Sequence, residues 1–168
     1  MESLVSTEWL EAELGAPDLR VIDATLFLPG MGRDARAEYE AEHIPGAVYF
    51  NIGEIADLDN PVPHMLPPEH KFASRMQSLG LGDGNRFVVY DNSPLHTAAR
   101  AWWMLKTYGA HYVALLGGGV QKWKAEDRSA GGHGSVGRGP GRAAGSVRVH
   151  RQGRPDGRDA AGHRGARP

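Results

Sequence analysis

The sequence predicts an α/β fold in which a central, mostly parallel sheet is flanked by helices. Short apolar segments rich in branched residues alternate with segments of helical periodicity along residues 1–127. The apolar segments lack polar alternation, which is typical of strands buried on both faces. At 168 residues, the chain has room for one domain with a substantial core.

The first part of the chain predicts a helix, a strand, a helix and a strand, over residues 6–15, 19–24, 34–42 and 47–50. Ser6 is a typical N-cap residue, and Gly15 is typical of a helix end. Residues 19–24 are apolar and branched, which favours a buried strand. Pro45 and Gly46 predict a turn that leads into the second strand.

The second part of the chain predicts the same alternation. A loop with four prolines covers residues 57–68. After it we expect a helix, a strand, a helix, a strand and a short helix, over residues 69–79, 86–90, 95–108, 112–116 and 120–125. Helical spacing of apolar residues, with a glycine just after the end, indicates the two longer helices. Branched residues indicate the strands.

The composition changes abruptly near residues 125–130. Residues 1–127 carry a net charge of −8, whereas residues 128–168 carry +7, from nine arginines and two aspartates. The second segment holds 11 glycines and only three aliphatic residues larger than alanine, so it has little apolar surface to offset its ordering entropy. We therefore predict one folded domain over residues 1–127 and a disordered Arg/Gly-rich tail over residues 128–168.

Two interpretations of this tail are open. An Arg/Gly-rich arm could bind nucleic acid through its charge, although it has no aromatic residues that would stack on bases. Alternatively, its codons are translated out of frame, because Arg, Gly, Ala and Pro all have GC-rich codons. The sequence favours the second interpretation, since composition alone is a weak signal of nucleic-acid binding.

Composition excludes several classes of protein. The absence of cysteine excludes disulfides, cysteine-based zinc sites and thiolate catalysis by this chain. The eight histidines are scattered, and none are spaced as in a helical zinc site, so neither a metal nor another cofactor is expected. No apolar run approaches the roughly 18 residues of a membrane span. Because the acidic Glu2 does not fit a signal peptide, we expect a cytoplasmic protein.

Candidate functional residues lie in the loop after the strand at residues 86–90. In open α/β sheets, ligands bind beyond the carboxyl ends of the strands, where loops lead into helix N-termini. We expect the backbone amides of residues 91–97 to hold a small anion there. The candidate anion-binding side chains are Asn92, Ser93, His96, Thr97 and, one turn into the helix, Arg100.

Simpler roles are open for the same residues. Asp91 or Ser93 can cap the helix, and an arginine on a helix, such as Arg100, is more often solvated or paired. A catalytic triad of Ser93, His96 and Asp91 is disfavoured, because close sequence neighbours rarely reach triad geometry. The glycines at 117–119 lack a dinucleotide-binding pattern and favour a tight turn or a close backbone approach.

A motif at residues 36–47 resembles the signature of the rhodanese family. Tyr39 and three further residues precede the run His43-Ile44-Pro45-Gly46-Ala47. Further segments resemble the first half of tandem-domain thiosulfate and 3-mercaptopyruvate sulfurtransferases: VIDA at 21–24, PHMLP at 63–67, YD at 90–91 and ARAWWML at 99–105. The resemblance extends in order over residues 3–127.

The resemblance implies sulfur transfer through a cysteine persulfide, held by a loop of backbone amides. The position of the family nucleophile is occupied here by Asp91, which cannot carry a sulfane sulfur. In tandem members the catalytic cysteine lies in the second domain, and the first domain is a cysteine-free partner. The chain is therefore expected to be inactive alone, and the full-length family to act on a small anionic sulfur compound.

The resemblance also implies structural roles. His43, Pro45 and Gly46 are expected to shape a turn. Asp23 and Arg36 are expected to pair inside the fold.

Two hypotheses about function follow. The leading one is a rhodanese domain truncated by a frameshift or an early stop, which binds a second rhodanese domain or another copy of itself. The alternative is a non-catalytic rhodanese-homology module that binds a partner through the Asp91 loop and the face around Trp103.

Gly117 stands where relatives usually carry an Asp before two glycines, so the turn there is expected to be less well held.

Overall fold

A computed structural model of the chain describes residues 1–131. Five parallel strands form one sheet in the order β1-β5-β4-β2-β3. They are β1 (Leu4–Val5), β2 (Leu19–Asp23), β3 (Val48–Tyr49), β4 (Arg86–Tyr90) and β5 (Tyr112–Leu116). Each strand is joined to the next by a segment that contains a helix, as parallel pairing requires.

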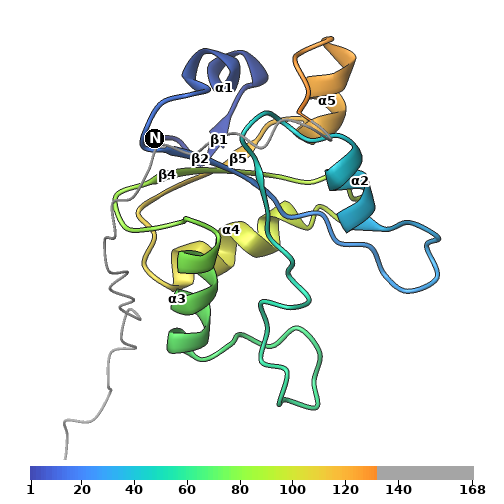
Figure 1. Cartoon of the computed structure of the whole chain (residues 1–168), viewed down its shortest axis with the longest axis vertical. Coiled ribbons are helices and arrows are strands. Elements are labelled where there is room, and N and C mark those ends of the chain that lie inside the picture. Colours follow the sequence, from blue (N-terminus) through green and yellow to red (C-terminus); the bar gives the residue numbers. More distant parts are fainter. Residues whose placement is uncertain (132–168) are drawn as a thin grey trace, which may run out of the picture.

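Helices cover both faces of this sheet (Figure 1). On one face lie α1 (Thr7–Glu13) and α5 (Gly119–Ala125), and on the other lie α3 (Glu69–Ser78) and α4 (Ala98–Thr107). The remaining helix, α2 (Ala35–Ala41), packs Tyr39 against the first face. The predicted α/β class with a central parallel sheet is thus confirmed.

Each face of the sheet has its own apolar core. Trp123 of α5 packs into one core together with Val88 of β4, and Phe72 of α3 packs into the other together with Val89. Val88 and Val89 are neighbours along one strand, so they point to opposite faces, and both are completely buried. Burial on both sides is the physical reason why the strands lack polar alternation.

The predicted elements agree with the structure except at their ends. Ser6 caps α1 as expected, since its hydroxyl oxygen accepts a hydrogen bond of 3.1 Å from the amide of Trp9. The predicted start of the fourth helix at Leu95 is wrong, because α4 begins at Ala98. His96 has a φ of +52°, which a right-handed helix does not allow. The sequence also does not predict β1, because its two residues lie between Ser3 and Ser6 and form no longer apolar run.

The residues just after the expected domain boundary at 127 still contact the folded domain, as far as Gly131. Gly131 exchanges two backbone hydrogen bonds with His43, of 2.9 and 2.7 Å. Arg128 forms ion pairs with Glu11 and Glu126. The predicted disorder and out-of-frame origin of the tail concern residues 132–168, which lie outside the described residues. Within residues 1–131, no helix has the length and apolar character needed to cross a bilayer.

Candidate functional site

The loop over residues 91–97 lies at the carboxyl edge of the sheet, where the segments after β2, β4 and β5 converge. The amide of Asn92 donates to the hydroxyl of Thr25 at 2.9 Å, which ties the loop to the end of β2. The amide of Val120 donates to the carbonyl of Asp91 at 3.4 Å, which ties it to the start of α5. The predicted position of the loop is therefore correct.

The side chain of Asp91 occupies the place expected for a bound anion. Its Oδ1 accepts a hydrogen bond of 3.2 Å from the amide of Ser93, and its Oδ2 accepts one of 2.5 Å from the amide of Ala98. Ala98 is the first residue of α4, so this carboxylate caps the helix and lies at the positive end of the helix dipole. Of the two capping residues considered, Asp91 has this role, whereas the hydroxyl of Ser93 accepts from Leu95 within the loop.

Three predicted site residues lie beside Asp91. Asn92, Ser93 and His96 border an open cavity of about 690 Å³, together with Leu4 and the glycines at 117–119. Ser93 is buried and His96 is exposed. The side chain of Asn92 is already engaged, because its amide group donates to Glu38 at 3.0 Å and its oxygen accepts from Gln121 at 2.5 Å.

Arg33 is a cationic neighbour of this loop that sequence reasoning missed. Its guanidinium donates to the carbonyl of Asn92 at 3.4 Å and forms two hydrogen bonds with Glu38, of 2.7 and 2.6 Å. These bonds lower the pKa of the Glu38 carboxyl. Arg33 also lies over the ring of Phe27, at 4.0 Å from the ring centroid. No pattern in the sequence links Arg33 to a loop almost sixty residues away, so only the fold reveals the contact.

Two predicted site residues, Thr97 and Arg100, point elsewhere. The hydroxyl of Thr97 donates to the carbonyl of Ala24 at 2.8 Å and accepts from the amide of Leu26, so it links the start of α4 to the segment after β2. Arg100 donates to the carbonyl of His64 at 2.5 Å and lies 4.7 Å from the ring centroid of Trp103. The structure therefore separates the five candidates into two groups.

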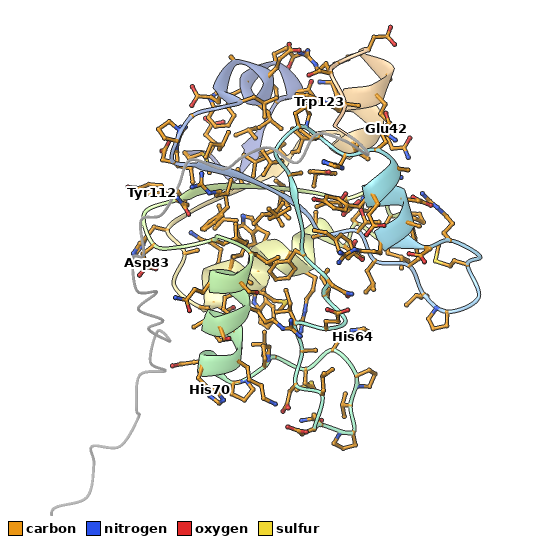
Figure 2. The ribbon with its side chains drawn as sticks, in the orientation of Figure 1. Glu42, His64, His70, Asp83, Tyr112 and Trp123 are labelled. Atoms are coloured by element: carbon orange, nitrogen blue, oxygen red, sulfur yellow. The ribbon has the colours of Figure 1, made fainter. Side chains whose placement is uncertain are left out.

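Arg100 and Trp103 border a second open cavity, of about 630 Å³. Its apolar wall includes Leu26 and Met65. His64, at its edge, lies on the long loop between β3 and α3 (Figure 2). The Nε atom of Arg100 is buried and has no hydrogen-bond partner among the described residues. Arg100 therefore contacts the loop rather than the amides near Asp91.

The turn after α2 is held by its own residues. The hydroxyl of Tyr39 donates to the carbonyl of Ala47 at 2.7 Å, and the ring of Tyr39 stacks on His43 with centroids 4.4 Å apart. Nδ1 of His43 contacts the carbonyl of Tyr39 at 2.7 Å. Gly46, after Pro45, has a φ of +76°, a conformation that favours glycine. The contacts of Tyr39 and His43 and the backbone conformation of Gly46 hold the turn between α2 and β3 in this shape.

The expected pair of Asp23 and Arg36 does not form, because each side chain has other partners. Asp23 is buried and accepts hydrogen bonds from the amide and the hydroxyl of Thr25, of 2.9 and 2.5 Å. Burial raises the pKa of its carboxyl. Arg36 lies on an exposed face of α2, where it pairs with Glu40 at 2.8 Å. The helical spacing of four residues favours that local pair over a buried one.

The glycines after β5 allow a close backbone approach, as expected. The amide of Gly117 donates to the carbonyl of Val5 at 2.8 Å, and a Cβ at Gly117 would lie 3.3 Å from that oxygen. A Cβ at Gly119 would lie 3.0 Å from the carbonyl oxygen of Asp91.

Among residues 1–131, no group of three His, Cys, Asp or Glu side chains is placed to hold a metal ion. The groups of this site that could bind an anion are therefore backbone amides, and the carboxylate of Asp91 already accepts hydrogen bonds from two of them, those of Ser93 and Ala98.

Comparison with known proteins finds one matching family model and several similar proteins that are named sulfurtransferases. Residues 6–126 match the family model of the rhodanese-like domain. The chain is 42% identical over 124 residues to the 3-mercaptopyruvate sulfurtransferase of Escherichia coli, which covers 73% of this chain and 44% of that protein. It is 43% identical over 127 residues to the human 3-mercaptopyruvate sulfurtransferase, which covers 72% of this chain and 43% of that protein.

A solved structure gives the same result. The crystal structure of SseA, a 3-mercaptopyruvate sulfotransferase from Escherichia coli, superposes with a TM-score of 0.76 at 34% identity, over 92% of this chain and 57% of that one. The chain thus spans less than half the length of the curated relatives it matches.

Proposed function

The chain belongs to the rhodanese family, and we propose that it is the cysteine-free partner domain of a sulfurtransferase. The observation that carries this proposal is that the carboxylate of Asp91 fills its own loop. A sulfur anion bound there would need the amides of Ser93 and Ala98, which Asp91 already engages. Because the chain contains no cysteine, a persulfide must form on another domain.

The relatives support a substrate class for the complete protein. Proteins more than twice as long as the matched segment are named 3-mercaptopyruvate sulfurtransferases, and one from Arabidopsis thaliana is named a thiosulfate/3-mercaptopyruvate sulfurtransferase. We infer that the complete protein takes sulfur from a small anionic donor of this type.

The face around Trp103 is the proposed contact surface for the second domain. Trp103 and Met65 are 42% and 44% exposed, and Leu26 lines the same cavity while it packs against the core. Clustered exposed apolar side chains are typical of an interaction surface. Arg100 holds the long loop in place beside Trp103, through its bond to the carbonyl of His64. This surface would therefore be formed before the second domain binds.

The first experiment assays the 168-residue chain alone. Thiosulfate with cyanide should give no thiocyanate above the blank, and 3-mercaptopyruvate should give no pyruvate. Turnover by the purified chain that is lost in Asp91→Ala would contradict the proposal, because it would make Asp91 a catalytic group.

The second experiment tests the partner role directly. In a chimera, residues 1–131 replace the matching segment of the Escherichia coli relative, which retains its own remaining sequence. We expect sulfur transfer, and we expect Trp103→Ala to lower kcat/KM by about tenfold through lost packing at the interface. Tyr112→Ala is the control, since Tyr112 is 53% exposed at the opposite edge of the sheet. A folded chimera in which both variants have the same effect would overturn the proposed surface.

A second candidate function is a binding module without any role in sulfur transfer. The exposed Trp103 face favours it equally, because the same surface could bind a regulatory protein or a second copy of the chain. A chimera that folds but shows no turnover, together with a partner that loses binding on Trp103→Ala, would favour this function. Sedimentation of the chain with and without the same substitution tests self-association.

A further inference from the structure

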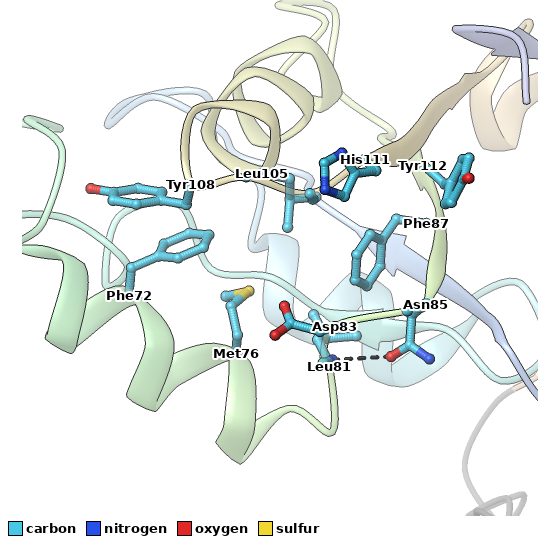
Figure 3. A pocket seen from close by; sticks show the side chains of 14 residues that line it. Phe72, Met76, Leu81, Asp83, Asn85, Phe87, Leu105, Tyr108, His111 and Tyr112 are labelled. Atoms are coloured by element: carbon cyan, nitrogen blue, oxygen red, sulfur yellow. Dashed lines mark hydrogen bonds between the residues drawn. The ribbon is translucent and has the colours of Figure 1, made fainter. Parts of the chain in front are cut away.

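Helix α3 borders two further cavities. On its inner side, Phe72 and Met76 line a cavity of about 240 Å³ together with Phe87 and Leu105 (Figure 3). All four residues are at most 5% exposed, so this cavity is part of the apolar core. The inner side of α3 therefore holds the helix on the sheet and leaves little side-chain surface for a ligand.

A second cavity lies on the exposed side of α3 and has a different lining. It has a volume of about 370 Å³ and lies between α3 and the segment over residues 54–58. The residues of α3 that line it are His70, Lys71, Ser74 and Arg75, and all four are exposed. His70 lies in the first turn of the helix (Figure 2). Because residues three and four positions apart lie on the same side of a helix, these side chains form one polar wall.

The opposite wall of this cavity combines apolar residues with one carboxylate. Ile55 and Ala56 are each 5% exposed, whereas Leu58 is 70% exposed and can contact a ligand. Glu54 is exposed and is the one acidic residue of the lining. It interacts electrostatically with Arg36 of α2, which offsets part of its charge.

The polar groups on α3 are available to a ligand. Among residues 1–131, no hydrogen bond, ion pair or ring contact engages the side chains of His70, Ser74 and Arg75. Lys71 pairs with Asp59 at 3.0 Å, but the two side chains are 45% and 85% exposed, so water weakens this pair. An anion in the cavity would therefore meet a guanidinium, an ammonium and a hydroxyl group.

We propose that this cavity binds a small phosphomonoester. The phosphoryl group lies between Lys71 and Arg75 and accepts a hydrogen bond from the hydroxyl of Ser74, as phosphate oxygens do from charged and hydroxyl donors. The organic part lies against the exposed side chain of Leu58. A phosphomonoester carries about 1.5 to 2 negative charges at pH 7, so it competes with the single charge of Asp59 for Lys71.

This site is separate from the proposed sulfur transfer. The cavity shares no residue with the cavity at the Asp91 loop or with the cavity at Trp103. Binding of a phosphomonoester can therefore be measured on this chain alone, whatever its role beside a second domain.

The experiment adds phenyl phosphate to the full, isotope-labelled 168-residue chain and follows the backbone amides by NMR. We expect saturable shifts at millimolar concentration for the amides of residues 70–75. The amides of residues 92–98, in the Asp91 loop, should not shift, because the carboxylate of Asp91 already occupies that loop. Benzyl alcohol, which has a ring without the charge, should leave residues 70–75 unchanged.

Charge variants locate the phosphoryl group. Lys71→Gln and Arg75→Gln should each weaken phenyl phosphate binding about fivefold, the size of an exposed charge pair. Glu54→Gln should strengthen binding, because it removes the acidic group of the lining. Lys122→Gln is the matched control for Lys71→Gln, since Lys122 also forms an exposed ion pair, with Glu126, and does not line the cavity.

Unchanged amide resonances of β4 show that each variant is folded, because this strand lies at the centre of the sheet. The proposal is overturned if phenyl phosphate leaves residues 70–75 unshifted, or if benzyl alcohol shifts them equally. It is also overturned if Lys71→Gln and Lys122→Gln have the same effect, or if the shifts are confined to residues 92–98.

Discussion

The carboxylate of Asp91 accepts hydrogen bonds from the amides of Ser93 and Ala98, so the anion that this loop stabilises is part of the chain itself. The same amides would stabilise a thiolate, because a helix N-terminus and convergent N–H groups favour any negative group. A single residue therefore decides whether the loop has chemical reactivity or only caps a helix.

Replacing Asp91 by cysteine tests this at the residue scale. Asp91→Cys would be the only thiol in the chain, and the amides of Ser93 and Ala98 should lower its pKa to roughly 7 from an ordinary value of about 8.5. The rate of alkylation against pH measures this pKa. Ser78→Cys is the control, because Ser78 is exposed at the end of α3, where the helix dipole disfavours a thiolate. Equal pKa values for the two thiols would show that the loop amides have no such effect.

Tyr90 connects two elements that are far apart in the sequence. It is the last residue of β4, it is completely buried, and its hydroxyl accepts a 3.2 Å hydrogen bond from the amide of Ile44. Burial raises the pKa of Tyr90 well above its ordinary value, so the hydroxyl stays protonated. The turn after α2 is thereby attached to the centre of the sheet.

We expect Tyr90→Phe to lower the free energy of unfolding by about 1–3 kcal/mol, because it leaves the buried amide of Ile44 without a partner. Urea denaturation measures this loss. Tyr112→Phe removes a hydroxyl from an exposed side chain and should change stability by less than about 0.5 kcal/mol. If both substitutions cost the same, the hydrogen bond to Ile44 does not contribute.

Helices α1 and α5 are joined by Glu126, and this contact should make stability depend on pH. The hydroxyl of Thr7 donates to Glu126 at 2.6 Å and Arg128 donates to it at 2.7 Å, and these bonds lower its pKa to about 2. A carboxyl whose pKa is lower in the folded state stabilises the fold above its unfolded pKa and loses this contribution as the pH falls. For Glu126, the loss spans the interval from 4.5 down to about 2.

Glu126→Gln should therefore flatten the decrease in stability between pH 4.5 and 2, measured as the urea midpoint at each pH. Thr7→Val removes the donor with the largest effect on the pKa of Glu126, so the decrease should be smaller and should end at a higher pH. If stability decreases equally between pH 4.5 and 2 in the original chain and in Glu126→Gln, Glu126 does not cause the decrease.

At the scale of the whole molecule, the domain extends past the point where the composition changes. The indole of Trp123 donates to the carbonyl of Ser129 at 2.9 Å, and Gly131 pairs with His43 through two backbone hydrogen bonds. Residues 128–131 thus hold α5 and the turn after α2 together.

A comparison of two shortened chains tests this extension. A chain that ends at residue 131 should unfold with a free energy about 1–3 kcal/mol higher than one that ends at residue 127, because the shorter chain lacks four hydrogen bonds and the Arg128 ion pairs. Thermal and urea denaturation of the two chains measure the difference. Equal stability would place the end of the folded domain at residue 127.

The sequence alone determined the α/β class, the alternation of strands and helices, the cap at Ser6 and the position of the candidate loop after β4. These features follow from local patterns, because burial of β4 on both faces shows in the run from Phe87 to Tyr90 and capping shows in a single residue. The Asp91 loop was visible as a turn followed by helical periodicity.

The role of this loop and the residues that belong to it follow from contacts that form only when the chain folds. Asp91 fills its own amides, Arg33 joins the loop, and Thr97 and Arg100 serve other contacts. The direction of a side chain depends on backbone torsions such as the positive φ of His96, and its partners come from segments tens of residues away. Local sequence patterns carry neither kind of information, because the packing of the sheet and its helices brings these groups together only after folding.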